Sequence, residues 1–116
     1  MRVAVIIALL ALAGPAVAAD GPTLFDAHCS DCHTTAAPES GPIGPSLKGV
    51  AGRPKAALTD FDYSPALKGK GGNWTDADLD AFITSPQDFA PGSKMFIGDT
   101  DPVERAAIIA YLKTGK

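Results

Sequence analysis

The sequence has 116 residues, of which 46% are hydrophobic, and its 13 acidic and 10 basic side chains give a formal net charge of −3. This length suits a single domain and is too short for two ordinary ones. The acidic balance argues against a nucleic-acid-binding protein, which would present a basic surface.

The first 19 residues have the pattern of a secretory signal peptide. Arg2 supplies a positive charge, and an apolar run of eleven residues follows from Val3 to Ala13. Small residues then fit cleavage before Ala19 or Asp20. Eleven helical residues span roughly 17 Å, well short of the ~30 Å hydrocarbon core, so a membrane anchor or a buried helix is the weaker interpretation. We therefore expect export to the bacterial periplasm, with residues 20–116 forming one soluble domain.

Three helices are predicted in that domain. The first opens at Asp20-Gly21-Pro22, because proline is well placed in the first turn of a helix. The second follows the capping residue Thr75, with Asp78 in the capping-box position, and stops at Pro86. The third starts at Asp101-Pro102 and presents apolar residues at helical spacing. These signals predict an all-α protein.

Long loops separate the predicted helices. The segments from Thr34 to Gly52 and from Phe89 to Gly98 are irregular, and the first is rich in Gly, Pro and Ser. Loops of this length are unusual in a compact domain with few helices. A central cofactor would organise them.

The five residues Cys29-Ser30-Asp31-Cys32-His33 form a C-x-x-C-H motif, the attachment pattern of c-type haem. Residues three apart lie on one face of a helix, so the two thiols can each add to one vinyl group of the same haem. His33 then lies under the iron and offers an imidazole nitrogen as an axial ligand. The motif predicts one covalently attached haem c, with its iron.

Three other chemistries compete for the same cysteines. A thioredoxin-like dithiol would accompany a βαβ pattern, and no strand pattern is evident. Zinc requires four ligands in a tetrahedral arrangement, whereas the Cys and His residues here are all confined to positions 28–33. A disulfide is possible in the apoprotein, but it would close too short a loop to stabilise a fold.

Met95 is the candidate for the sixth ligand of the iron. It lies in Pro91-Gly92-Ser93-Lys94-Met95, an irregular segment that we call the strap. A thioether suits iron, and Met/His coordination raises the reduction potential. The alternative is a methionine that only fills a gap in the core. His28 is pinned beside Cys29 on the tethered side, so we interpret it as a surface or helix-face histidine.

With motif and strap in place, the chain resembles class I cytochrome c, the soluble family of mitochondrial cytochrome c and its bacterial short-chain relatives. The resemblance extends over nearly all of residues 20–116. Gly21 and Phe25 match the family's first crossing helix, and Ile108 and Tyr111 match its last helix. It implies the cytochrome c fold, with the N- and C-terminal helices crossing and a middle helix and long loops wrapped around one haem.

The resemblance also assigns a haem environment. The Pro45 carbonyl would accept a hydrogen bond from the His33 ring, which fixes the tautomer of the ring. The Tyr63 hydroxyl and the Trp74 indole would hold a haem propionate, with Arg53 neutralising its charge. Ser93 stands where the strap of the family usually has threonine.

Two departures from the family pattern affect the pocket. Leu67 and Phe82 stand where many relatives have an asparagine and a tyrosine. We therefore expect a more apolar pocket. The acidic balance also differs from that of the basic mitochondrial proteins, so their docking partners are not carried over.

The leading functional hypothesis is that the protein is not an enzyme but a soluble, monomeric electron carrier. Its partners would be redox proteins: a membrane cytochrome complex, an oxidase, a reaction centre or a dehydrogenase. The alternatives are a peroxidase-like haem enzyme or gas sensor with a labile sixth site, and a dedicated electron acceptor of one periplasmic dehydrogenase.

The charge distribution bears on those partners. Residues 48–70 carry five basic and two acidic side chains, whereas residues 76–105 carry seven acidic and two basic ones. This asymmetry indicates either two solvated faces or a dipolar surface that orients a partner protein.

Overall fold

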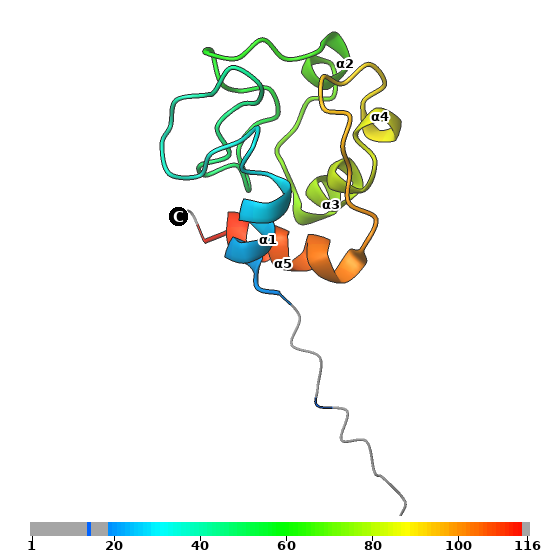
Figure 1. Cartoon of the computed structure of the whole chain (residues 1–116). Coiled ribbons are helices and arrows are strands. Elements are labelled where there is room, and N and C mark those ends of the chain that lie inside the picture. Colours follow the sequence, from blue (N-terminus) through cyan, green and yellow to red (C-terminus); the bar gives the residue numbers. More distant parts are fainter. Residues whose placement is uncertain (1–13, 15–18, 115–116) are drawn as a thin grey trace, which may run out of the picture.

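Five helices and the segments between them make up the computed structural model, which describes residue 14 and residues 19–114 (Figure 1). In chain order the helices are α1 (Gly21–His28), α2 (Pro65–Lys68), α3 (Asp76–Thr84), α4 (Pro86–Phe89) and α5 (Pro102–Leu112). The all-α prediction is confirmed for these residues. The predicted signal peptide lies almost entirely outside them. Within the described ranges, no helix has the length and apolar character needed to cross a membrane.

The three predicted helices begin where the sequence places their caps. The Asp20 carboxylate accepts a hydrogen bond from the Thr23 N–H at 3.0 Å, and the Thr75 hydroxyl accepts one from the Asp78 N–H at 3.1 Å. The Asp101 carboxylate accepts one from the Val103 N–H at 2.8 Å. Each cap satisfies an N–H that has no partner within its helix, and so fixes where the helix starts.

The two short helices, α2 and α4, were not predicted. Each has four residues and begins with a serine cap followed by proline, Ser64-Pro65 in α2 and Ser85-Pro86 in α4. Pro86 therefore both ends α3, as predicted, and starts α4. The prediction that Pro86 only stops a helix was incomplete, because proline in a first turn is also a starting signal.

Helices α1 and α5 cross at one end of the molecule (Figure 1). Gly21 allows the close approach, because a Cβ there would overlap the Ala107 carbonyl oxygen and lie 2.7 Å from the Tyr111 Cβ. The Phe25 and Tyr111 rings pack with centroids 5.4 Å apart, and Ile108 is 1% exposed. The predicted crossing of the first and last helices is confirmed.

The loops are held together by backbone hydrogen bonds rather than by a sheet. Gly52 N–H donates to the Trp74 carbonyl and Trp74 N–H to the Arg53 carbonyl, both at 2.8 Å. Lys55 extends this contact, since its ammonium lies 2.7 Å from the Asp78 carboxylate of α3. These links fasten the loop that follows the C-x-x-C-H motif to the start of α3. The loop and the helices thereby enclose a shared interior.

Candidate cofactor site

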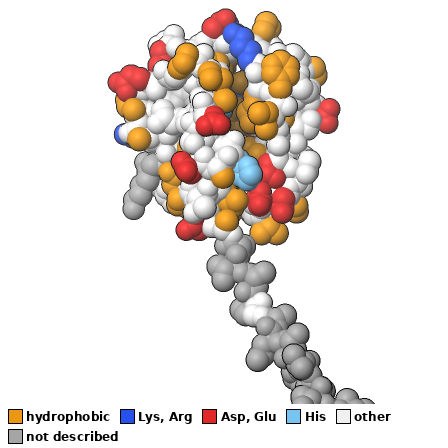
Figure 2. Space-filling model, in the orientation of Figure 1, with side chains coloured by type: hydrophobic (Ala, Val, Ile, Leu, Met, Phe, Trp, Pro, Cys, Tyr) orange, Lys and Arg blue, Asp and Glu red, His pale blue; other side chains and the backbone are white. Residues whose placement is uncertain are grey.

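A cavity of about 270 Å³ lies between the C-x-x-C-H segment, the loops, α2, α3 and the strap. Hydrophobic side chains gather around a hollow on the face shown in Figure 2. All the site residues predicted from the sequence line this cavity: Cys29, Cys32, His33, Pro45, Arg53, Tyr63, Trp74, Ser93 and Met95. The fold thus brings together residues that are up to 66 positions apart.

The two cysteines lie in a turn that continues α1. Cys29 caps the helix, and the N–H groups of Cys32 and His33 donate to the Cys29 carbonyl at 3.1 and 2.9 Å. Both thiols are free. Burial, with smaller contributions from Asp99 and Cys32, raises the pKa of Cys29 to about 11. A protonated thiol is a poor nucleophile, so the raised pKa argues against Cys29 as the reactive thiol of a thioredoxin-like pair.

The His33 ring is fixed against the loop that follows it. Its Nδ1 lies 2.8 Å from the Pro45 carbonyl oxygen, and a carbonyl only accepts, so Nδ1 carries the proton. Burial lowers the pKa of His33, which favours the neutral ring. A neutral ring protonated at Nδ1 keeps the Nε2 lone pair for a metal. Gly44 makes room for this ring, because a Cβ there would lie 2.7 Å from the His33 Cε1.

The strap places Met95 on the cavity wall. Ser93 is 3% exposed, and its hydroxyl accepts a hydrogen bond from the Met95 N–H at 3.2 Å. Gly92 has a φ of +87°, a conformation that glycine adopts without strain. Met95 is half-buried and belongs to no helix. Its position is compatible with an iron ligand.

Gln87 is a site residue that the sequence analysis missed. Its side-chain amide, on α4, contacts the backbone of three strap residues: Gly92, Ser93 and Met95. The Ser85-Pro86 pair could have indicated a helical turn just before the strap. No sequence pattern indicates that the next side chain reaches across to it.

Two buried polar atoms on the cavity wall lack partners within the described residues. They are the Tyr63 hydroxyl and the Arg53 Nε. The other guanidinium nitrogens of Arg53 donate to the carbonyls of Ser46 at 3.0 Å and Lys48 at 3.2 Å, which fixes the side chain. Burial lowers the pKa of Arg53. Unpartnered buried donors are costly, so this end of the cavity suits an anionic acceptor such as a carboxylate.

Most of the remaining wall is apolar. Leu67 on α2 is 7% exposed, and the Phe82 ring lies 5.2 Å from the Trp74 ring, centroid to centroid. Phe89 stacks on Trp74 at 5.8 Å and packs edge-on against Phe82 at 5.7 Å, so the three rings form one cluster. The two residues that depart from the family pattern, Leu67 and Phe82, therefore add apolar surface, as expected. Such a wall suits a large flat apolar group and excludes water.

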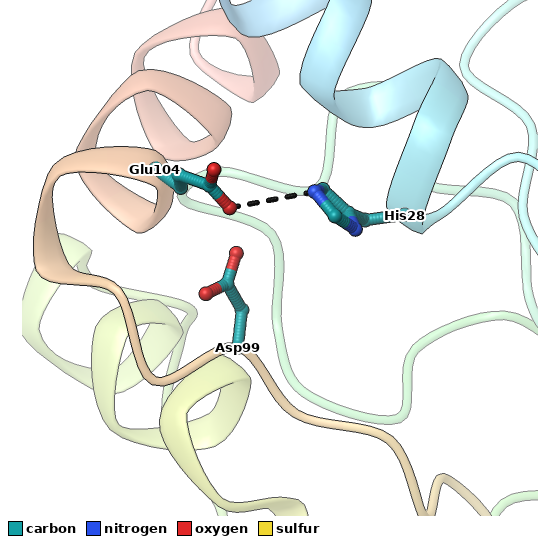
Figure 3. A group of neighbouring side chains, drawn as sticks. All are labelled: His28, Asp99 and Glu104. Carbon is teal, nitrogen blue, oxygen red and sulfur yellow. Dashed lines mark ion pairs between the residues drawn. The ribbon is translucent and has the colours of Figure 1, made fainter. Parts of the chain in front are cut away.

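His28 takes part in a separate polar group at the edge of the cavity (Figure 3). Its Nε2 lies 3.4 Å from a Glu104 carboxylate oxygen, which links the end of α1 to the start of α5. The Asp99 carboxylate points toward this pair from the segment before α5 (Figure 3). The prediction that His28 is a helix-face histidine agrees with this position.

The residues of the cavity fit haem c as a set. Two thiols flank one end, an imidazole nitrogen and a thioether line the walls, and two unpartnered donors suit propionate carboxylates. Cys29 and Cys32 would bind the vinyl groups, and Arg53 and Tyr63 the propionates. This fit depends on the donor chemistry and not on the shape of the cavity alone.

Comparison with known proteins points to the same chemistry. The family model described as "Cytochrome c" matches residues 18–116. A "Cytochrome c homolog" of Rickettsia bellii is 49% identical over 87 residues, which cover 74% of this chain and 50% of that protein. The "Cytochrome c-type cyt cy" of Rhodobacter capsulatus is 41% identical over 95 residues, which cover 81% of this chain and 47% of that protein. This chain thus spans about half the length of these curated relatives.

A solved structure has the same fold. Cytochrome cH from Methylobacterium extorquens superposes with a TM-score of 0.73 at 40% identity, and the match covers 81% of this chain and 94% of that one. The shared fold therefore extends over most of this chain and nearly all of that one.

Proposed function

This chain belongs to the cytochrome c family, and we propose that it carries single electrons between redox proteins through a haem ligated by His33 and Met95. Members of the family bind one covalent haem c, whose iron alternates between the ferrous and ferric states. Cys29 and Cys32 would form the thioether links. With both axial positions filled, no open site remains for a substrate.

One observation carries the proposal: the cavity collects the C-x-x-C-H motif and a methionine 62 residues beyond it. The His33 ring is already turned with its Nε2 available, because Nδ1 donates to Pro45. Met95 reaches the same cavity from the strap. An imidazole and a thioether on one apolar cavity suit a carrier of raised reduction potential.

The other residues would hold the haem and limit its contact with water. The apolar wall of Leu67, Trp74 and Phe82 lowers the local dielectric, which would disfavour the more highly charged ferric iron and raise the reduction potential. Arg53 and Tyr63 would partner the propionates. A rigid site that needs little rearrangement between oxidation states suits electron transfer.

We further propose that a redox partner docks where the cavity opens. Three large apolar side chains that line the cavity are exposed: Ile43 (63%), Phe96 (80%) and Ile97 (73%). An exposed apolar rim of this kind is typical of a protein contact surface. The partner would be a membrane cytochrome complex, an oxidase, a reaction centre or a dehydrogenase. The carrier itself would be a monomer in the bacterial periplasm, after cleavage before Ala19 or Asp20.

Absorption spectra of the holoprotein test this proposal. We expect a low-spin c-type spectrum when the protein is reduced, and a methionine-to-iron charge-transfer band when it is oxidised. We also expect slow binding of carbon monoxide by the reduced protein, because the sixth position is filled. A high-spin, five-coordinate spectrum at neutral pH, or rapid carbon monoxide binding, would contradict the proposal.

A further inference from the structure

We infer that Gln87 is the positioning residue of Met95: its side-chain amide fixes the strap so that the sulfur stays in place. This inference rests on the proposed role of Met95 as an iron ligand. Gln87 would affect how firmly Met95 is held at the iron, and it would not contact the iron itself.

The contacts of Gln87 with the strap are close and numerous. Its Nε2 donates to the Ser93 carbonyl at 2.7 Å and to the Met95 carbonyl at 2.9 Å. Its Oε1 accepts from the Gly92 N–H at 3.2 Å. One side chain thereby holds both ends of the turn that carries the ligand.

The amide suits these contacts better than any charged side chain of similar size. A primary amide offers two N–H donors and a carbonyl acceptor, whereas a carboxylate only accepts and an ammonium only donates. Asparagine has the same groups but is one methylene shorter. The strap presents two carbonyls and one N–H to Gln87, which matches that set.

The helix that carries Gln87 is itself well anchored. Ser85 caps α4 through the Asp88 N–H, and Pro86 and Ala90 at its two ends are buried. Helix α4 also packs on α3. The amide is therefore presented from a rigid support, and a hydrogen bond from a fixed donor costs little additional ordering.

A second contact of the strap differs in kind. Lys94 binds Asp62 through the backbone carbonyl and through a carboxylate oxygen at 2.9 Å, and both side chains are exposed. Exposed ion pairs weaken with salt and acid. The contacts of Gln87 are neutral, and those with Ser93 and Met95 are half-buried, so its hold on the strap should persist over a wide range of pH and salt.

Two substitutions in the holoprotein test the inference. Gln87→Ala removes all three hydrogen bonds, and Gln87→Glu keeps the size but loses the donors. Asp88→Asn, at the next, exposed position of α4, is the matched control. The first readout is the pH at which the oxidised protein loses its methionine-to-iron band as the pH is raised. The second is hydrogen exchange of the Gly92 amide in the reduced protein, which reports on the strap without relying on the iron.

The expected result is specific to Gln87. Gln87→Ala should exchange the Gly92 amide about tenfold faster than the wild type, as expected when about one net hydrogen bond is lost. Gln87→Glu keeps the oxygen that accepts from the Gly92 N–H, so its exchange should stay nearer to the wild type. Both Gln87 variants lose the donors to the Ser93 and Met95 carbonyls, so both should lose the band at a lower pH than the wild type as the pH is raised, whereas Asp88→Asn should behave as the wild type.

Two contrary results have different meanings. A wild-type protein that shows the band, with Gln87 variants unchanged in both readouts, would overturn this inference alone. A wild-type protein without the band would refute ligation by Met95 and, with it, the inference.

Discussion

The two segments proposed to ligate the iron are held in different ways. On the tethered side, formed by residues 29–33 and the loop 44–53, His33 follows directly on two cysteines that would be bonded to the haem. Its ring also donates to the Pro45 carbonyl. On the strap side, Met95 has no tether, and Gln87, Ser93 and Lys94 hold its segment by hydrogen bonds and one ion pair.

This difference implies that the two sides determine different properties of the protein. Attachment and the first ligand depend on covalent geometry, so a disturbance there should affect assembly or stability. The second ligand depends on contacts of modest individual strength, so a disturbance there should affect the reduction potential and access to the iron. The strap side is where properties can change without loss of the cofactor.

The largest effect should come from the tether. Cys29→Ser and Cys32→Ser each remove one thioether bond, so the yield of protein that retains haem on a denaturing gel should fall to a small fraction of wild type. Ser30→Ala, between the cysteines, should retain haem. If both cysteine variants retained haem as fully as the wild type, the claim that covalent bonds hold the tethered side would be wrong.

Met95→Ala should leave haem attached while changing the iron site. Loss of the thioether should lower the reduction potential by a substantial part of the about 0.8 V range that axial ligands span. The reduced variant should also bind carbon monoxide rapidly. Phe96→Ala, at the exposed neighbouring position, should keep the wild-type potential within a small margin. An unchanged potential in Met95→Ala, measured by redox titration, would exclude Met95 as a ligand.

Gly44→Ala tests how tightly the tethered side is packed. The new Cβ would lie 2.8 Å from the Cys32 carbonyl oxygen and the same distance from the His33 Nδ1. Overpacking of this kind costs about 1–3 kcal/mol, which denaturant unfolding of the holoprotein would measure. The matched control is Gly41→Ala, where the atom nearest to the new Cβ, the Gly44 carbonyl oxygen, is 3.9 Å away. Equal stability of the two variants would mean that the His33 ring is not confined as described.

Asp62→Asn should have the smallest effect. Hydrogen bonds from Lys94 and then Lys68 hold the pKa of the Asp62 carboxyl below its usual value. A depressed pKa in the folded state stabilises the protein above the ordinary value of about 3.9, and this contribution is lost as the pH falls through the lower folded value. The stability difference between wild type and variant should therefore be small at pH 7 and disappear in strong acid or 1 M salt. A difference that grows on acidification would contradict the sign of this shift.

The sequence predicted the tethered side more completely than the strap side. C-x-x-C-H is a local pattern, and its spacing alone indicates haem attachment. The helix caps at Asp20, Thr75 and Asp101 are equally local patterns. The nine predicted site residues all line one cavity, although their roles in binding haem stay predictions. The resemblance to a known family supplied the contact between His33 and Pro45, which no local pattern indicates.

The features that the sequence did not predict are contacts between side chains and segments that are apart in the chain. The local pair Ser85-Pro86 could have indicated the short helix α4, but the reach of the Gln87 side chain to the strap has no sequence signal. Two ion pairs, Lys55 with Asp78 and Lys94 with Asp62, join the segments 48–70 and 76–105. The charge counts of these segments do not indicate which residues pair. The Lys55–Asp78 pair neutralises one charge of each segment's excess, so the segment counts overstate the asymmetry there.

The central claim is that the iron has a nitrogen ligand from His33 and a sulfur ligand from Met95. X-ray absorption at the iron edge of the oxidised and reduced holoprotein tests this most directly. We predict one sulfur and five nitrogen atoms around the iron in both states, and loss of the sulfur in Met95→Ala. A first coordination sphere of nitrogen and oxygen atoms alone in the wild-type protein would contradict the account.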